Sequence, residues 1–122
     1  MIHLARMNPT TAVRAAAILG FLAVALGAFG AHGLKATLAQ HETGAIWQTA
    51  ALYHLVHSAV LLTLAHRTPV LRFSFLLFYS GIFVFSGSLY LLAVTNSKWL
   101  GAITPVGGLC LLAGWLTLAL KR

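Results

Sequence analysis

The stretch AAAILGFLAVALGAFGAHGL, residues 15–34, carries no formal charge over 20 consecutive positions. An α-helix rises about 1.5 Å per residue, so roughly 20 apolar residues cross the ~30 Å hydrocarbon core of a bilayer. Arg14 precedes the stretch and Lys35 follows it. The spacing between these charges therefore predicts one membrane-spanning helix.

Three further uncharged windows follow along the chain, at 43–66, 73–97 and 99–120. They are continuously apolar and lack the alternation of polar and apolar residues that is typical of barrel strands. Short connections between spans place neighbouring helices antiparallel. The predicted fold class is all-α: an integral membrane four-helix transmembrane bundle, up-down antiparallel, with spans at roughly 12–32, 45–66, 71–94 and 99–120.

The composition excludes the other broad classes of protein. Of the 122 residues, 60% are hydrophobic and only 7% are charged, and the charged set is eight Lys or Arg plus the single acid Glu42. So few charges cannot cover a soluble globule, whereas disordered chains are far less apolar. The first span also resembles a signal peptide, since Arg6 and Arg14 precede it, but its apolar stretch exceeds the usual length of about 7–15 residues.

The distribution of basic residues predicts an orientation. With the N-terminus inside, Lys35 and Lys98 face outward, and six basic residues face the cytoplasm: Arg6, Arg14, Arg67, Arg72, Lys121 and Arg122. This is the positive-inside bias, so both termini are expected to be cytoplasmic and the location is expected to be the cell membrane, as in the bacterial inner membrane. The charges are spread over two faces, which favours membrane lipids as partners and gives no nucleic-acid footprint.

No composition shift or linker divides the chain, so residues 1–122 are interpreted as a single transmembrane domain. The longest link, roughly residues 33–44, contains Leu34 and Leu38, and this spacing of four predicts a short interfacial helix on the outer surface.

Small residues follow helical spacing in every span. Such faces let helix backbones approach closely in a membrane, where packing rather than burial from water drives association. We interpret them as seams of a compact bundle; faces left spare within one chain would favour self-association. The glycines assigned to helix packing are Gly20, Gly27, Gly30, Gly81, Gly87, Gly107, Gly108 and Gly114.

Thr104-Pro105 interrupts the fourth span. Either the helix begins near Lys98 and bends at Pro105, or Thr104 caps a shorter helix with Pro105 in its first turn. A discontinuous helix whose freed backbone groups bind an ion is the functional alternative.

Ionisable groups inside a membrane are functional candidates, and here they are histidines. His54 and His57 lie mid-span, three residues apart, on neighbouring parts of one helix face. Three interpretations remain open: hydrogen bonds to a Ser, a Thr or a backbone carbonyl of a neighbouring helix, a metal or haem site, and a proton relay. The candidate polar cluster comprises His32, Gln48, Tyr53, His54, His57, Ser58 and Thr104.

Other chemistry finds little support. The single Glu42 excludes paired-carboxylate catalysis, Cys110 is alone, and no phosphate-binding glycine loop is present. No catalytic, metal-binding or cofactor-binding residue is therefore assigned, and the chain is not expected to be an enzyme. Trp47, Tyr90 and Trp99 lie near predicted outer boundaries and are interpreted as interfacial anchors.

Several strings together resemble a known family. GAFGAHGLK (27–35) ends the first span, FSGSLY (85–90) lies in the third, and ITPVGG (103–108) opens the fourth, with WQTA (47–50) and the Tyr53-His54 pair in the second. In this order they resemble the small multi-spanning membrane proteins grouped as domain of unknown function 423. The resemblance implies a multi-span protein of the bacterial inner membrane or of an organelle membrane, and implies no activity.

The function expected from these observations is that of a small membrane protein without catalysis of its own, which self-associates or serves a larger membrane complex. A channel or carrier for protons or small solutes is the alternative, with His54, His57, His32 and the Pro105 bend as its polar path. A haem or quinone redox subunit is the third hypothesis.

Overall fold

The start of the first long helix follows from its local sequence. In this computed structural model, which describes residues 7–120, α1 (Pro9–Ala31) begins after Asn8. The Asn8 side chain accepts hydrogen bonds from the backbone N–H groups of Thr10 and Thr11, at 2.8 and 3.3 Å. Pro9, which has no N–H to satisfy, occupies the first turn. The basic residues Arg6, Lys121 and Arg122, used above to predict orientation, lie outside the described residues.

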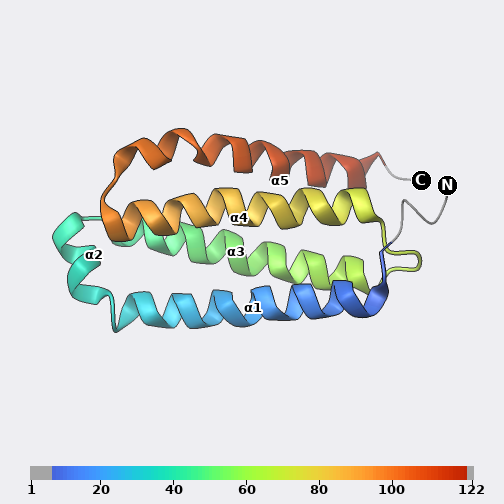
Figure 1. Ribbon diagram of the computed structural model, residues 1–122, viewed down its shortest axis with the longest axis horizontal. Coiled ribbons are helices and arrows are strands. Elements are labelled where there is room, and N and C mark those ends of the chain that lie inside the picture. The colour runs from blue at the N-terminus through green and yellow to red at the C-terminus, as the bar shows by residue number, and fades with distance from the viewer. Residues whose placement is uncertain (1–6, 121–122) are drawn as a thin grey trace.

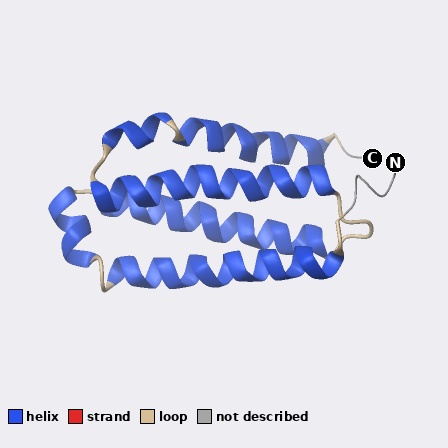
Figure 2. Ribbon diagram, viewed as in Figure 1, coloured by secondary structure: helices blue, strands red, loops and turns tan. Residues whose placement is uncertain are grey.

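All regular elements of the described range are helical, and the loops lie at the two ends of the molecule except for the short break between two helical segments of the last span (Figure 2). After α1 come the short α2 (Lys35–His41) and the long α3 (Gly44–Ala65) and α4 (Arg72–Thr95). The 3₁₀-helix η2 (Lys98–Ala102) then leads into α5 (Thr104–Ala119). Four helical segments, the last one combining η2 and α5, are long and apolar enough to cross a membrane.

The long helices pack antiparallel as a row in the order α1, α3, α4, α5 (Figure 1). Each contacts the next along the row, whereas no Cα atom of α1 lies within 8 Å of one in α4 or α5. The starts of α1 and α4 and the ends of α3 and α5 share one end of the molecule, and α2 lies at the other (Figure 1). The four-helix bundle is therefore all-α and antiparallel, as predicted, but it is open between its first and last helices.

Pro105 lies in the first turn of α5, as in the second of the two arrangements considered for this helix. Thr104 is the first helical residue and makes no side-chain cap. Its hydroxyl instead lies 2.6 Å from the Ser88 hydroxyl of α4. The short η2 segment precedes the break, so the fourth span is a 3₁₀-helix followed by an α-helix.

The α1–α3 interface is built from small residues on both sides. Ala12, Ala16 and Ala23 of α1 are buried, and a Cβ atom on Gly20 would lie 3.8 Å from the Ser58 Cβ of α3. Nearer the outer end predicted from the charges, the Trp47 ring covers Gly30, where a Cβ would overlap the indole. Close backbone approach thus replaces large interlocking side chains along this interface.

The α4–α5 interface depends on glycines more strictly. A Cβ on Gly107 would overlap the Phe85 backbone, and a Cβ on Gly81 or Gly114 would come within 3.0 Å of the Leu111 or Phe78 side chain. A Cβ on Gly27 or Gly108 would make only ordinary contacts with the neighbouring helix, at 3.7–4.0 Å. Gly87 is the exception in the predicted packing set, because a Cβ there would meet nothing within 4 Å.

The link between α1 and α3 contains a short helix, as predicted, and it is fastened to the end of α4. The Thr43 hydroxyl donates to the Ala93 carbonyl at 2.7 Å, and Nδ1 of His41 lies 3.1 Å from the same oxygen. Glu42 and Asn96, which end α2 and α4, both adopt left-handed backbone conformations at φ 57°. The ends of three helices are therefore joined at one carbonyl.

Candidate functional site

His57 is buried in α3 and both of its ring nitrogens are occupied. The Trp115 indole of α5 donates to Nε2 at 3.1 Å, and Nδ1 lies 2.8 Å from the Tyr53 carbonyl. An indole N–H only donates, so Nε2 must accept and Nδ1 must carry the proton that it donates to Tyr53. His57 is thus a neutral bridge between α3 and α5, which fits the structural interpretation.

His54 is buried to the same degree, 4% exposed, but only one of its nitrogens has a partner. Nδ1 lies 2.8 Å from the Tyr90 hydroxyl of α4, and the two rings meet edge to face. The Leu19 backbone carbonyl of α1 approaches the ring from the opposite helix, yet no hydrogen bond joins it to Nε2. Nε2 of His54 is the one buried side-chain nitrogen or oxygen without a partner among the described residues.

Serine hydroxyls around the histidines bond to backbone rather than to the rings. Ser58 donates to the His54 carbonyl within α3, and Ser86 of α4 donates to the Ala50 carbonyl of α3, both at 2.8 Å. Each hydroxyl thus has a backbone carbonyl as its hydrogen-bond acceptor, which is the usual arrangement in membrane helices, where water is absent. Neither serine is available as a nucleophile activated by histidine.

The remaining members of the predicted cluster do not join His54. His32 and Gln48 are exposed, and Tyr53 is 42% exposed while its ring packs on Phe85. Thr104 is bonded to Ser88 at the start of α5. The structure therefore brings together His54, His57 and Ser58 on the buried face of α3, with the exposed Tyr53 stacked on His57, and leaves His32, Gln48 and Thr104 apart.

Two residues interpreted as interfacial anchors have different roles. Trp47 is buried and its indole donates to the Leu26 carbonyl of α1 at 2.9 Å, and Tyr90 is the partner of His54. Those two interpretations were wrong, because the Trp47 indole N–H and the Tyr90 hydroxyl both form hydrogen bonds inside the protein. Trp99, 68% exposed, alone keeps the expected exposure. The partner expected for His54, a Ser, a Thr or a backbone carbonyl, is likewise replaced by Tyr90.

Nothing in residues 7–120 gathers three His, Cys, Asp or Glu side chains that could hold a metal ion. Cys110 is free and half-buried in α5. The site around His54 thus offers neutral hydrogen-bonding groups in an apolar setting, which can orient a carbonyl or hydroxyl group.

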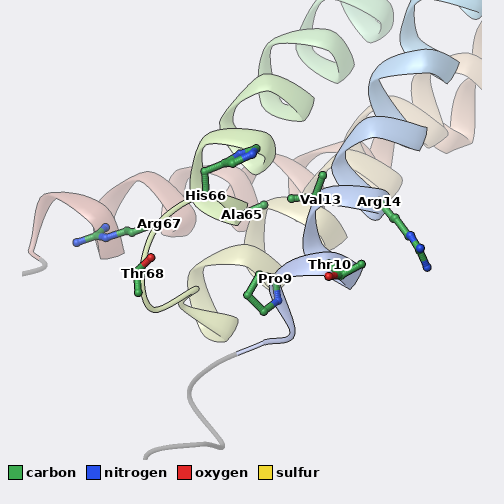
Figure 3. A pocket seen from close by; sticks show the side chains of 8 residues that line it. All are labelled: Pro9, Thr10, Val13, Arg14, Ala65, His66, Arg67 and Thr68. Atoms are coloured by element: carbon green, nitrogen blue, oxygen red, sulfur yellow. The ribbon is translucent and has the colours of Figure 1, made fainter.

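A hollow of about 450 Å³ lies elsewhere, between the start of α1 and the end of α3. Figure 3 shows that the Arg14 and Arg67 side chains leave it on opposite sides and do not point toward each other. His66 is bonded to the Leu62 carbonyl of its own helix. The hollow has a basic rim but no converging catalytic groups.

Comparison with known proteins identifies relatives across most of the chain. Residues 26–108 match the family model described as Protein of unknown function (DUF423). UPF0382 inner membrane protein YgdD of Escherichia coli strain K12 is 44% identical over 106 residues, covering 82% of this chain and 79% of the relative. UPF0382 membrane protein YwdK of Bacillus subtilis is 41% identical, covering 82% and 85%.

A third relative, UPF0382 membrane protein SAB0533 of Staphylococcus aureus, is 39% identical over 106 residues, covering 84% of this chain and 86% of the relative. No solved structure matches the chain. The family match, the membrane proteins among the relatives and the four apolar spans agree with one another, and the chain belongs to the DUF423 family of uncharacterised multi-span membrane proteins.

Proposed function

We propose that this protein is a non-catalytic component of the cell membrane that acts by lateral association, with a second copy of itself or as an accessory to a larger membrane complex. The open row of helices carries the proposal. α1 and the combined η2–α5 span form its two edges. In an apolar 18-residue stretch of each, only 22% and 17% of the residues are buried, against 33% and 39% for α3 and α4.

Glycine faces are not the feature of the structure that favours association. Most of the packing glycines are used within the chain, at the α1–α3 and α4–α5 interfaces. Few glycine faces are therefore left to bind a partner. The two uncovered edges of the row support association instead. A helix row offers each edge to a partner without rearrangement.

The same proposal includes an orientation with both termini in the cytoplasm. Arg14, Arg67 and Arg72 share the end of the molecule where α1 starts, and Lys35 and Lys98 share the other (Figure 1). This segregation supports the positive-inside orientation and contact of the first end with anionic lipid headgroups.

Cysteine cross-linking in membranes tests the association. In a Cys110→Ala background, Leu112→Cys on α5 and Phe21→Cys on α1 place a thiol on each edge, and Leu52→Cys on α3 is the matched exposed control. We expect dimer formation on oxidation for an edge variant and not for Leu52→Cys. The mass of the protein in native-membrane nanodiscs should exceed that of a monomer; a monomeric mass together with no edge-specific cross-link overturns the proposal.

A further inference from the structure

A shallow apolar groove runs between α1 and α4 and has the buried His54 of α3 among its lining residues. Its volume is about 150 Å³, and its walls are leucines of α1 and Ile82, Phe83, Gly87 and Tyr90 of α4. It exists because α1 and α4 flank α3 and none of their Cα atoms come within 8 Å of each other. An apolar cavity of about this volume accepts one benzene-sized ring.

The hydrogen bonding of His54 indicates which kind of group would pair with its Nε2 atom. If Tyr90 donates to Nδ1, Nε2 carries a proton and one donor is left unmatched. If Nδ1 donates to Tyr90 instead, both the Tyr90 hydroxyl hydrogen and the Nε2 lone pair lack partners. The first arrangement leaves fewer unsatisfied groups, so Nε2 presents an N–H donor that faces the Leu19 carbonyl of α1 without forming a hydrogen bond of good geometry to it. Its natural complement is a carbonyl oxygen.

The depth of His54 restricts where that carbonyl comes from. The residue lies near the middle of α3, ten residues after Gly44 and eleven before Ala65. At about 1.5 Å per residue it is therefore roughly 15 Å from either end of the span. Ester carbonyls of phospholipids stay near the headgroups, on the order of 15 Å from the midplane. The carbonyl must belong to a molecule that dissolves in the interior of the bilayer.

We propose that the α1–α4 groove binds the ring of a membrane-soluble quinone, with a ring carbonyl accepting a hydrogen bond from Nε2 of His54. The ring matches the groove in size, its carbonyl matches the unmatched donor, and its hydrocarbon tail leaves through the open side into lipid. Nε2 has almost no exposed surface in the structure, so the proposal requires side chains that line the groove to move aside when the ring enters. The proposal concerns binding and includes no redox step.

Gly87 provides a sharp test, because its Cβ position is open and it lines the groove. Gly87→Leu fills the groove without touching the His54–Tyr90 bond. Gly44→Leu is the matched control, since a Cβ there also meets nothing within 4 Å and Gly44 lies outside the groove. His54→Phe keeps an aromatic ring at the floor and removes the donor.

The probe is a benzoquinone with a decyl tail, titrated into the protein in lipid nanodiscs with empty nanodiscs as background. We expect saturable binding that Gly44→Leu retains, that Gly87→Leu weakens at least tenfold, and that His54→Phe weakens about three- to tenfold. In protein carrying ¹⁵N-labelled histidine rings, the His54 Nε2 resonance should shift on saturation and the His57 resonances should not.

Three results overturn the proposal: no saturable binding above empty nanodiscs, equal binding by Gly87→Leu and the unsubstituted protein, or an unmoved His54 resonance at saturation. Decylbenzene, which lacks a carbonyl, is the ligand control. If it binds as tightly as the quinone and equally well to His54→Phe, the groove is an apolar site only and the hydrogen bond is excluded.

Discussion

The Tyr90 hydroxyl lies 2.8 Å from Nδ1 of His54, although the two residues lie at different levels of the α3–α4 hairpin. Ser86 of α4 bonds to Ala50 of α3 across the same interface, and this bond shows which residues of the two helices lie at the same level. By that alignment, Tyr90 lies about two helical turns further along α4 than the residue opposite His54. Side chains of a helix lean toward its N-terminus. Because α3 and α4 are antiparallel, His54 and Tyr90 lean toward each other and close that distance.

Removing the Tyr90 hydroxyl should destabilise the protein. Tyr90→Phe leaves Nδ1 of His54 buried without a partner, and we expect a loss of about 1–2 kcal/mol in the free energy of unfolding. Thermal unfolding in one fixed detergent measures it as a Tm lower by several degrees. Tyr79→Phe is the control, since the Tyr79 hydroxyl makes no hydrogen bond to another described residue. Equal Tm values for the two variants would contradict the assigned bond.

The α4–α5 contact should be intolerant of a single methyl group. Gly107→Ala places a Cβ against the Phe85 backbone, which cannot move aside without separating the helices. We expect a loss of about 1–3 kcal/mol, as for overpacked interiors. Gly87→Ala meets open space and should be neutral or stabilising by roughly 0.5–1 kcal/mol. Thermal unfolding of the two variants side by side gives the comparison, and a reversed order would refute the close approach.

The bridge from Trp115 to His57 predicts a particular histidine tautomer. His57 should carry its proton on Nδ1, because the Trp115 N–H needs Nε2 as an acceptor. Ring-labelled ¹⁵N spectra distinguish the two nitrogens directly. Trp115→Phe should shift the His57 Nε2 resonance, because that nitrogen loses its donor, while Nδ1 keeps the proton that it donates to the Tyr53 carbonyl and the His54 resonances stay in place. A protonated Nε2 in the unsubstituted protein would disprove the bridge.

Orientation can be read from the labelling of two loops. In a Cys110→Ala background, Thr68→Cys lies in the α3–α4 connection and Gln40→Cys lies in α2 at the other end, both exposed. With cytoplasmic termini, a membrane-impermeant maleimide added to intact cells should label Gln40→Cys alone. Labelling of Thr68→Cys should then require lysis, and the opposite pattern would reverse the proposed topology.

Charge spacing was enough to predict the four spans because a charge in the hydrocarbon core is costly and each span must fit between charges. The short helix at 35–41 was also predicted, from the spacing of Leu34 and Leu38. What charge and length do not encode is which helices touch. Nothing in the sequence pattern distinguishes a closed bundle from the open row, since the same small residues line either arrangement.

The site was predicted in part. That His54 and His57 lie on a buried helix face followed from their spacing, but their partners did not. Tyr90 and Trp47 lie near span ends, where aromatic residues usually anchor in the interface, so their position along the chain led to the wrong interpretation. The signal that was available is the lean of side chains in antiparallel helices, which carries Tyr90 inward toward the middle of the membrane.

The order of helices in the row has a consequence for biogenesis. Every backbone contact between long helices in the row joins two spans that are consecutive in the chain. During synthesis a newly inserted span can therefore dock on its predecessor at once, and assembly needs few contacts between distant parts of the chain. The Trp115–His57 bond reaches past α4 to α3 and can form only when the last helix is in place. This hydrogen bond would therefore form last, after the four spans have been inserted one after another.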